Sequence, residues 1–478
     1  MDRNDIRNKL SPLINDGMII QRNASFPIRT QEKASVSFLG KTYESAEKDG
    51  KWLIMLDPLE AGGPFSMEIQ IGDEKIKIDD IYAGDVWLCA GQSNMEMEMS
   101  QLRKLYNTEW DEAEKKQMLI RHFRTPKEWD FDSPRSDISG GNWKTASKES
   151  LGEFSAVAYF YAKYIYEKYK IPIGLVNASW GGTPVEAWMS REALKNYPEK
   201  IEYSENCRSV EFRAKEFEES GYMIAEKEYL FAQKPIGNFN AMIYPLLKFS
   251  YKGVIWYQGE SNDSAPEDYS SLFKSMIQDW RKLNLQLTIN SKQKNEDEIL
   301  PFFFVQLPVW KEASDNNQHS AWAMLREAQA SALELPNTGM ACALELGMWD
   351  DIHPVNKKDV GYRLFLAMEK VLHNVNNSSP GPVIREQRIV NSENKILIFF
   401  DNCAEGLIKK EETAYVCVIG SKGYKRLPAE IERKDCISID YSSIINPRMI
   451  LYAWADNPKD RQLFNSDGLP VIPFKIDL

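Results

Sequence analysis

The sequence lacks the residue patterns that build metal clusters, disulfide frameworks and membrane spans. Its 478 residues include four histidines and six cysteines, and no two cysteines form a CxxC pair, which argues against zinc-ribbon and thioredoxin-type motifs. No His or Cys cluster has metal-ligand spacing, and neither a metal nor an organic cofactor is expected. No apolar run approaches the roughly 18–20 residues that span a bilayer. We therefore expect neither a metal centre nor a membrane partner.

Dense basic patches are also missing. Lys and Arg number 59 against 70 Asp and Glu, a net charge of −11, which argues against a nucleic-acid partner. The first ten residues, MDRNDIRNKL, lack the apolar core of a signal peptide. Cys89, Cys342 and Cys417 lie in apolar, strand-like runs that suit free, buried thiols. These features together favour a cytoplasmic location.

The chain has the composition of a soluble globular protein and the length of two or three compact units. It is 43% apolar and 27% charged. Short alternating runs bounded by turn residues predict a β-rich region over residues 1–80 and another over residues 381–478. Residues 81–380 are predicted to form an α/β core. A charged, helical stretch at about residues 190–240 interrupts this core, either as a lid or as a surface insertion without function.

The core alternates buried strands with helices. Continuous apolar runs, typical of a parallel sheet covered on both faces, predict strands over residues 85–89, 173–177, 253–257, 301–307 and 339–344. Helical periodicity predicts helices over residues 155–169, 268–283, 321–335 and 355–373. This order implies right-handed crossovers and a three-layer α/β fold with a parallel sheet.

Polar and titratable residues follow these strands, where ligands bind in an open α/β sheet. Ser93 lies between a strand and a helix, the setting of an exposed nucleophile; the alternative is that it only caps the helix. His353 follows the last core strand, with Asp350 three residues before it. An Asp-x-x-His turn lets the carboxylate orient the imidazole, and we prefer Asp350 to its rival, Asp351.

Other residues near these strand ends could bind the oxyanion or the substrate. Gly181 and Gly182 can bring a backbone N–H to a developing oxyanion, although they also suit an ordinary tight turn. Gln258 and Asn262 offer side-chain donors, and Glu260 is a second acid or fixes its loop. The candidate substrate-binding residues are Gln92, Asn262 and two indoles that could stack on sugar rings, Trp180 and Trp349.

Five ordered motifs now make a resemblance recognisable: GQSNM at 91–95, ASWGGTPVEAW at 178–188, FNAMIYPLL at 239–247, GVIWYQGESN at 253–262 and DIHP at 351–354. The set resembles the sialate O-acetylesterases of the SGNH hydrolase superfamily. The likeness extends to GMIIQR at 17–22 and DGLPVIPF at 467–474, so it covers nearly the whole chain.

The resemblance implies a flavodoxin-like three-layer core with β-rich flanks, and hydrolysis of O-acetyl esters of sialic acids, with the 9-O-acetyl ester expected. By position, Ser93 is the nucleophile, His353 the base and Asp350 its orienting acid. The amides of Ser93 and of Gly182 or Gly181 help form the oxyanion hole. The wider superfamily places an asparagine in its third block where this chain has Ser261, so Gln258 is our candidate for the missing donor.

Three rival functions stay open at this point. The first is the same chemistry on other acetylated glycans, such as acetyl-xylan. The second is a glycosidase that uses paired carboxylates such as Glu260 and Asp350. The third is a non-catalytic carbohydrate-binding protein built on β modules.

Overall fold

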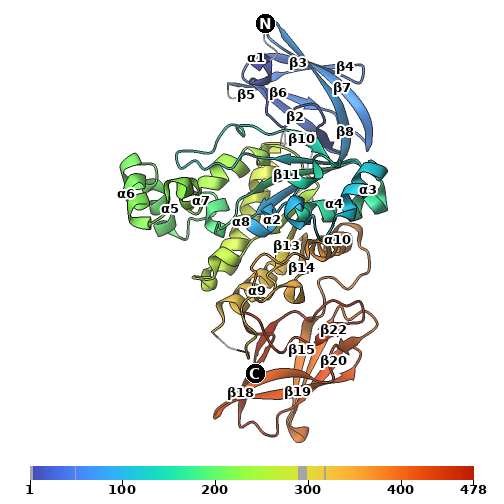
Figure 1. The fold of residues 1–478 in the computed structure, drawn as a ribbon, viewed down its shortest axis with the longest axis vertical. Coiled ribbons are helices and arrows are strands. Elements are labelled where there is room, and N and C mark those ends of the chain that lie inside the picture. The colour runs from blue at the N-terminus through green and yellow to red at the C-terminus, as the bar shows by residue number, and fades with distance from the viewer. Residues whose placement is uncertain (1–3, 49, 289–298, 317–318) are drawn as a thin grey trace. The chain divides into compact units, whose positions relative to one another are not determined.

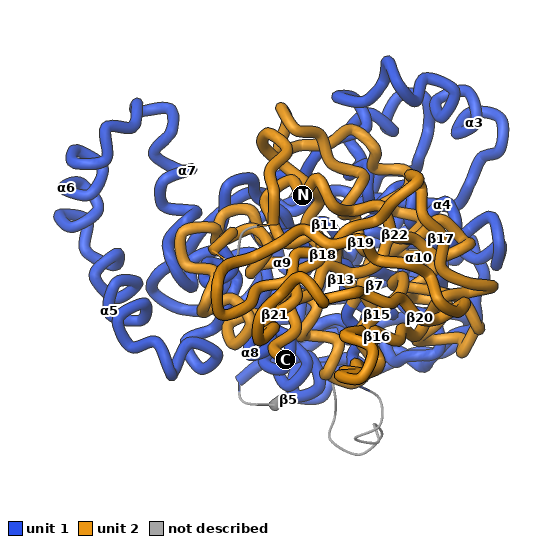
Figure 2. The backbone as a smooth tube through the Cα atoms, turned by 90° about the horizontal axis from the view of Figure 1, so that it is seen from below, with its two compact units in different colours: residues 1–258, 274–302 blue, residues 259–273, 303–478 orange. Residues whose placement is uncertain are grey.

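The computed structural model describes residues 4–48, 50–288, 299–316 and 319–478. Contacts between Cα atoms divide the chain into two compact units (Figure 2): residues 1–258 with 274–302, and residues 259–273 with 303–478. The division into three regions, at residues 80 and 380, stays a prediction. Each unit is described by itself.

The first unit is organised around one long strand, β8 (Glu74–Gly91), which runs through residue 80 without a break. Its first half alternates buried and exposed side chains, as a strand with one solvated face does, and pairs antiparallel with β7 (Gly62–Ile71). Its second half is buried throughout and pairs in parallel with β11 (Ile173–Ser179) and β12 (Gly253–Tyr257). This change of burial pattern within β8 marks the point from which both faces of the sheet are covered.

The strand order around β8 is β10-β9-β11-β8-β12. Strand β9 (Ile120–Arg124) is parallel to β11, and β10 (Trp143–Thr145) is antiparallel to β9. The sequence analysis had missed β9 because Arg121, His122 and Arg124 break its apolar pattern. In the structure Arg121 donates to Asp80 at 2.7 Å, and burial lowers the pKa of His122 to about 3, which keeps the imidazole neutral.

Of the remaining strands of the first unit, some join the sheet of β8 and the others form a small sheet of their own. Strands β3 and β4 extend the antiparallel sheet of β7, β1 adds to β8 in parallel, and β2, β6 and β5 form a separate sheet. Their bounds are Ile19–Gln21 (β1), Phe26–Thr30 (β2), Ala34–Phe38 (β3), Lys41–Glu44 (β4), Ala46–Lys48 (β5) and Lys51–Leu56 (β6).

The helices of the first unit flank this sheet or leave it. Helix α4 (Ala156–Tyr169) begins after Ser155, whose hydroxyl accepts from the Ala158 amide, and ends at Lys170 in a left-handed conformation. Three helices of the predicted insertion form an arm that projects from the unit (Figure 1). The bounds are Asn4–Arg7 (α1), Ser93–Glu96 (α2), Thr108–Lys116 (α3), Pro198–Asn206 (α5), Val210–Ser220 (α6) and Lys227–Ala232 (α7). Helix α8 (Pro266–Thr288) has residues in both units.

The second unit contains the last strands of the core and a β-rich C-terminal part. Strand β14 (Thr338–Cys342) is the neighbour of β13 (Phe302–Gln306), and helices α9 (Ala321–Ser331) and α10 (Lys357–His373) accompany them. A seven-stranded antiparallel sheet follows in the order β15-β16-β20-β19-β18-β21-β23, and β17 pairs with β22. The bounds are Val383–Val390 (β15), Lys395–Asp401 (β16), Leu407–Lys409 (β17), Ala414–Gly420 (β18), Gly423–Arg433 (β19), Cys436–Asp440 (β20), Pro447–Tyr452 (β21), Leu463–Asn465 (β22) and Phe474–Asp477 (β23).

The predicted α/β class, with a mostly parallel central sheet and a β-rich C-terminal region, is confirmed. Each predicted core strand overlaps an observed one, and the strand at 253–257 has the predicted bounds. All six cysteines are free and buried, as expected for Cys89, Cys342 and Cys417. None of the helices within the described ranges combines the length and apolar character that crossing a membrane requires.

Candidate active site

The carboxyl end of β8 is a tight turn that presents Ser93. Gly91 has φ of +137°, and a methyl group built on it would lie 2.1 Å from the carbonyl oxygen of Tyr257, so only glycine fits. The Gln92 amide donates to that carbonyl at 3.0 Å, and the Trp180 amide donates to the Gly91 carbonyl at 3.1 Å. The ends of β11 and β12 therefore hold the chain on both sides just before Ser93, the half-buried first residue of α2.

The Gly181–Gly182 turn lies against Ser93. A methyl group built on Gly181 would be 3.3 Å from Cβ of Ser93. Gly182 has φ of +71°, a left-handed conformation that favours glycine. Behind the turn, the Thr183 hydroxyl donates to the Trp180 carbonyl, and Gln258, fully buried, donates through Nε2 to the Thr183 carbonyl at 3.2 Å. The predicted oxyanion residues Ser93, Gly181, Gly182 and Gln258 thus all belong to one braced region of the first unit.

Glu96, a residue that the sequence analysis missed, ties this turn to α2. Its Oε2 accepts the Gly181 amide proton at 2.7 Å, and its Oε1 accepts from Arg124 at 3.3 Å and from Lys127. The Gly181 amide is therefore occupied by a carboxylate, which leaves the Gly182 amide as the better oxyanion donor of the two. The signal in the sequence is a carboxylate three residues after Ser93, just beyond the GQSNM motif at 91–95.

We expect Glu96→Ala to lower kcat by about 10- to 100-fold with little change in KM, because small misplacements of catalytic groups cost rates of this order. Without the carboxylate, the turn beside Ser93 loses its tether. Glu96→Gln keeps an acceptor for Gly181 and should recover most of the rate. Glu98→Ala is the matched control, since Glu98 also binds Arg124 but not Gly181. Equal losses in Glu96→Ala and Glu98→Ala, measured by acetate release, would contradict this role.

His353 lies in the second unit, in the connection between β14 and α10. The carboxylate beside its ring is that of Asp351: Nδ1 and Oδ1 are 3.8 Å apart, and the same oxygen accepts the His353 amide proton at 2.7 Å. The ring contact is longer than a hydrogen bond, as is common in the absence of substrate. This geometry favours Asp351 as the carboxylate that orients His353, whereas the sequence analysis preferred Asp350.

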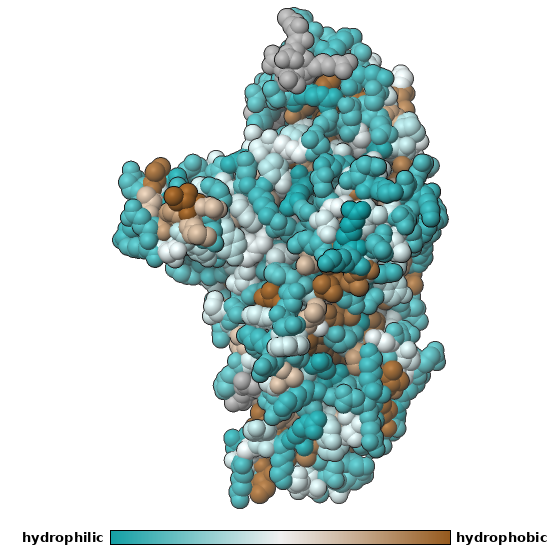
Figure 3. All heavy atoms as spheres, in the orientation of Figure 1, coloured by the Kyte–Doolittle hydropathy of each residue, from teal (hydrophilic) through white to brown (hydrophobic). Residues whose placement is uncertain are grey.

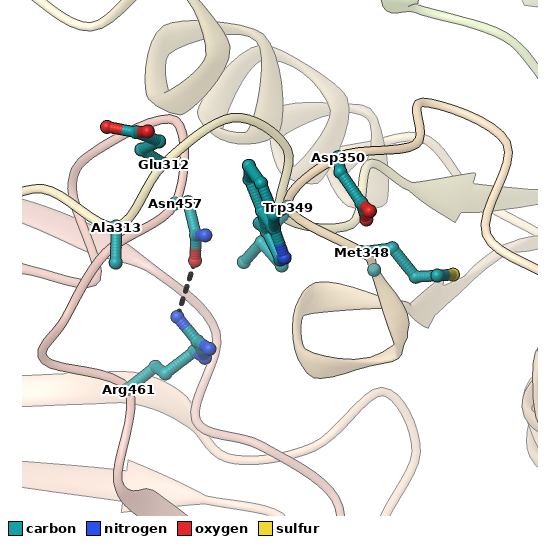
Figure 4. A pocket seen from close by; sticks show the side chains of 9 residues that line it. Glu312, Ala313, Met348, Trp349, Asp350, Asn457 and Arg461 are labelled. Carbon is teal, nitrogen blue, oxygen red and sulfur yellow. Dashed lines mark hydrogen bonds between the residues drawn. The ribbon is translucent and has the colours of Figure 1, made fainter.

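Asp350 instead faces a pocket of the second unit. This pocket, of about 710 Å³, is lined by Asp350, Trp349, Glu312 and Arg461, among others, and the Arg461 guanidinium donates to Asn457 within it (Figure 4). Trp349 is 58% exposed, so its indole face is accessible. Asp350 and Trp349 therefore line the same pocket. Among the described residues, the carboxylate paired with the His353 imidazole is that of Asp351, not that of Asp350.

A buried lysine lies behind the histidine. Lys357 is fully buried, and its Nζ donates to the carbonyl of Pro354 at 2.8 Å. Burial lowers the pKa of Lys357 to about 7, although the nearby carboxylates of Glu260 and Asp351 oppose the shift. Glu260, also in the second unit, is 5% exposed. Its buried carboxylate therefore stabilises the charge of Lys357 and does not act as an acid that faces solvent.

The His353 imidazole is predominantly neutral at pH 7. Burial lowers the pKa of His353 below 6.5; Asp351 raises it and Lys357 lowers it. We expect kcat/KM to be level at neutral pH and to fall by half only at a pH under 6.5, because the protonated ring cannot accept a proton. A profile measured from about pH 5 to 8, with circular dichroism to detect acid unfolding, checks this. A midpoint above 6.5 would argue against His353 as the base.

The other predicted substrate-binding residues are buried. Gln92 and Asn262 are 2% and 3% exposed, and Trp180 is 6% exposed. An indole with so little free surface has no face to offer a sugar ring, so its burial argues for a packing role. Among the described residues, no group of three or more His, Cys, Asp or Glu side chains could hold a metal ion.

Comparisons with known proteins agree on one family. A family model described as carbohydrate esterase, sialic acid-specific acetylesterase, matches residues 83–214 and 231–369. The mouse sialate O-acetylesterase is 29% identical, over 92% of this chain and 86% of its own length, and the human one is 28% identical over 88% and 81%. A crystal structure of a carbohydrate acetylesterase from Xanthomonas citri is 32% identical and superposes with a TM-score of 0.82, covering 98% of this chain and 99% of its own.

Proposed function

Because this chain belongs to the sialic acid-specific acetylesterase family of carbohydrate esterases, we propose that it removes O-acetyl groups, that on O9 included, from sialic acids. Membership makes it a carboxylic ester hydrolase that acts on acetylated sugars. The same membership argues against a glycosidase and against a binding protein without activity. The sugar, the acetyl position and the catalytic residues are the parts that we propose.

The observation that carries the chemistry is the turn around Ser93. A serine at the end of a buried central strand, held by Gly91 and faced by the Gly181–Gly182 turn, has the setting of an activated nucleophile. Its Oγ attacks the acetyl carbonyl, and the neutral imidazole of His353 takes the proton. Asp351 orients the imidazole and stabilises its charge.

The tetrahedral oxyanion is held by the amides of Ser93 and Gly182. Gln258, our candidate side-chain donor, instead supports the turn through the bond from its Nε2 to the Thr183 carbonyl. His353 then returns its proton to the sugar oxygen as the alcohol leaves. Water hydrolyses the acetyl-serine by the reverse proton path, which releases acetate and restores Ser93. No metal ion takes part in these steps.

The test compares acetate release from 9-O-acetylated sialic acid and from acetylated xylan, with 4-nitrophenyl acetate as a substrate that carries no sugar. We expect kcat/KM for the sialic acid to exceed that for xylan by about 10-fold or more, the scale on which a contact-making pocket discriminates. A preference for xylan would assign the enzyme to the other acetylated glycans. Esters at O4 and O7 of the same sugar, tested side by side, identify the acetyl position.

A further inference from the structure

The helical arm formed by α5, α6 and α7 is tied firmly to the first unit. Phe231 and Leu230 of α7 share a small apolar core with Cys207 and Phe131. Trp129 donates through its indole N–H to Glu228 at 2.8 Å, and Lys200 of α5 bonds Glu186 at 2.6 Å. The arm is thus held in place through apolar packing at α7 and one polar contact each from α7 and α5.

Part of this arm lies outside the family match, which leaves out residues 215–230. The segment includes the connection from α6 to α7, where Met223 and Ile224 are 69% and 85% exposed. Apolar side chains are visible on the surface of the arm in Figure 3. The segment therefore lies outside what the family model describes.

Tyr229 is the residue of this segment that contacts the active-site turn. A methyl group built on Gly182 would lie 2.0 Å from the Tyr229 hydroxyl oxygen and 2.6 Å from its ring, so the phenol rests directly on Gly182. Gly181, the residue just before Gly182, is the one that contacts Ser93. The phenol is therefore one residue away from the contact with the nucleophile, and it also bounds the turn that we assign to the oxyanion.

The Tyr229 side chain is free to meet a ligand. The residue is 37% exposed, and its ring meets Tyr222 edge-on, with centroids 6.0 Å apart. Its hydroxyl has no hydrogen-bond partner in the described part of the chain. Burial raises the pKa of Tyr229, so the phenol stays protonated and can donate a hydrogen bond. In contrast, the indole of Trp180 at the same turn is 6% exposed.

From these contacts we infer that Tyr229 is a specificity-determining residue that binds the sugar part of the ester. The inference rests on the proposed function. An acetyl group is small, so most of the substrate extends beyond the turn at Ser93, and Tyr229 is a partly exposed side chain that packs on this turn. A phenol there offers an apolar ring edge to the sugar C–H groups and a hydroxyl to the sugar hydroxyls. The segment 215–230 thereby contributes a sugar contact beside the catalytic turn.

The experiment measures kcat and KM of Tyr229→Ala and Tyr229→Phe on whichever acetylated sugar the wild-type enzyme hydrolyses best, and on 4-nitrophenyl acetate. For Tyr229→Ala we expect kcat/KM on the sugar to fall about 10-fold or more, mainly through KM, and on 4-nitrophenyl acetate about threefold at most. Tyr229→Phe, which loses only the hydroxyl, should lie between. Ile224→Ala, an exposed apolar change in the same segment, is the control and should behave as wild type.

Equal losses on both substrates would show that Tyr229 only supports the turn, and no loss on the sugar would show that it makes no contact. Either result overturns the inference. Because the test uses the best sugar rather than sialic acid, it stands apart from the proposed function, which fails if 9-O-acetylated sialic acid is a poor substrate of the wild-type enzyme.

Discussion

Ser93→Ala is expected to lower kcat/KM for acetyl esters by about 10⁴-fold or more, since the acyl-enzyme cannot form without the hydroxyl. The fold should be unaffected. The turn is set by Gly91, whose site admits no Cβ, and by backbone hydrogen bonds of Gln92 and Trp180, none of which uses the serine side chain. The rate is measured as acetate release, and circular dichroism and thermal unfolding check the fold.

A fluorophosphonate probe gives the same test without a substrate. The wild-type enzyme should carry one phosphonate on Ser93, located by mass spectrometry of peptides, and Ser93→Ala should carry none. Ser100→Ala is the matched control, because Ser100 is an exposed serine in the same segment. Labelling at another serine, or full activity in Ser93→Ala, would overturn the assignment of the nucleophile.

Asp351→Asn is expected to lower kcat/KM by about 10²- to 10⁴-fold, and Asp350→Asn by less than about threefold, because only the carboxylate that orients the imidazole and stabilises its charge contributes to catalysis. The structure places Asp351, and not Asp350, next to Nδ1 of His353. The two substitutions change the same chemical group at adjacent positions, so each is the control for the other. Both variants are measured on the same acetyl ester.

The opposite ranking would restore Asp350, the residue that the sequence analysis preferred. Equal and small effects would mean that His353 acts without an orienting carboxylate. Loss of the charge should also move the acidic limb of the pH profile to lower pH, because Asp351 raises the pKa of His353. This displacement separates an electrostatic role for Asp351 from a role in folding, which would leave the limb where it is.

The core strands and helices were predictable because they are local patterns with a physical cause. A strand buried on both faces is a nearly continuous apolar run, as β12 is, and a helix such as α4 begins at a serine cap, which the sequence displays. Strand β9 was missed because its charges are neutralised from a distance: Asp80, which binds Arg121, is 41 residues away in the chain.

Within the candidate site, the sequence determined which residues could carry chemistry. Ser93, His353 and the paired glycines stood out because they follow buried strands, and the carboxyl ends of parallel strands meet at one edge. The motifs were also enough to indicate the family, which the comparisons confirmed. These inferences needed only residue type, spacing and order along the chain.

Only the tertiary structure decided which neighbours those residues have. The backbone of a short loop, rather than the spacing of its residues, turns Asp351 toward the imidazole and Asp350 toward a pocket. Glu96 reaches an amide 85 residues further along the chain, and Tyr229 reaches Gly182 from an inserted helix. Such contacts follow from how separate elements pack, and packing depends on the summed burial of many side chains, which no local pattern of residues records.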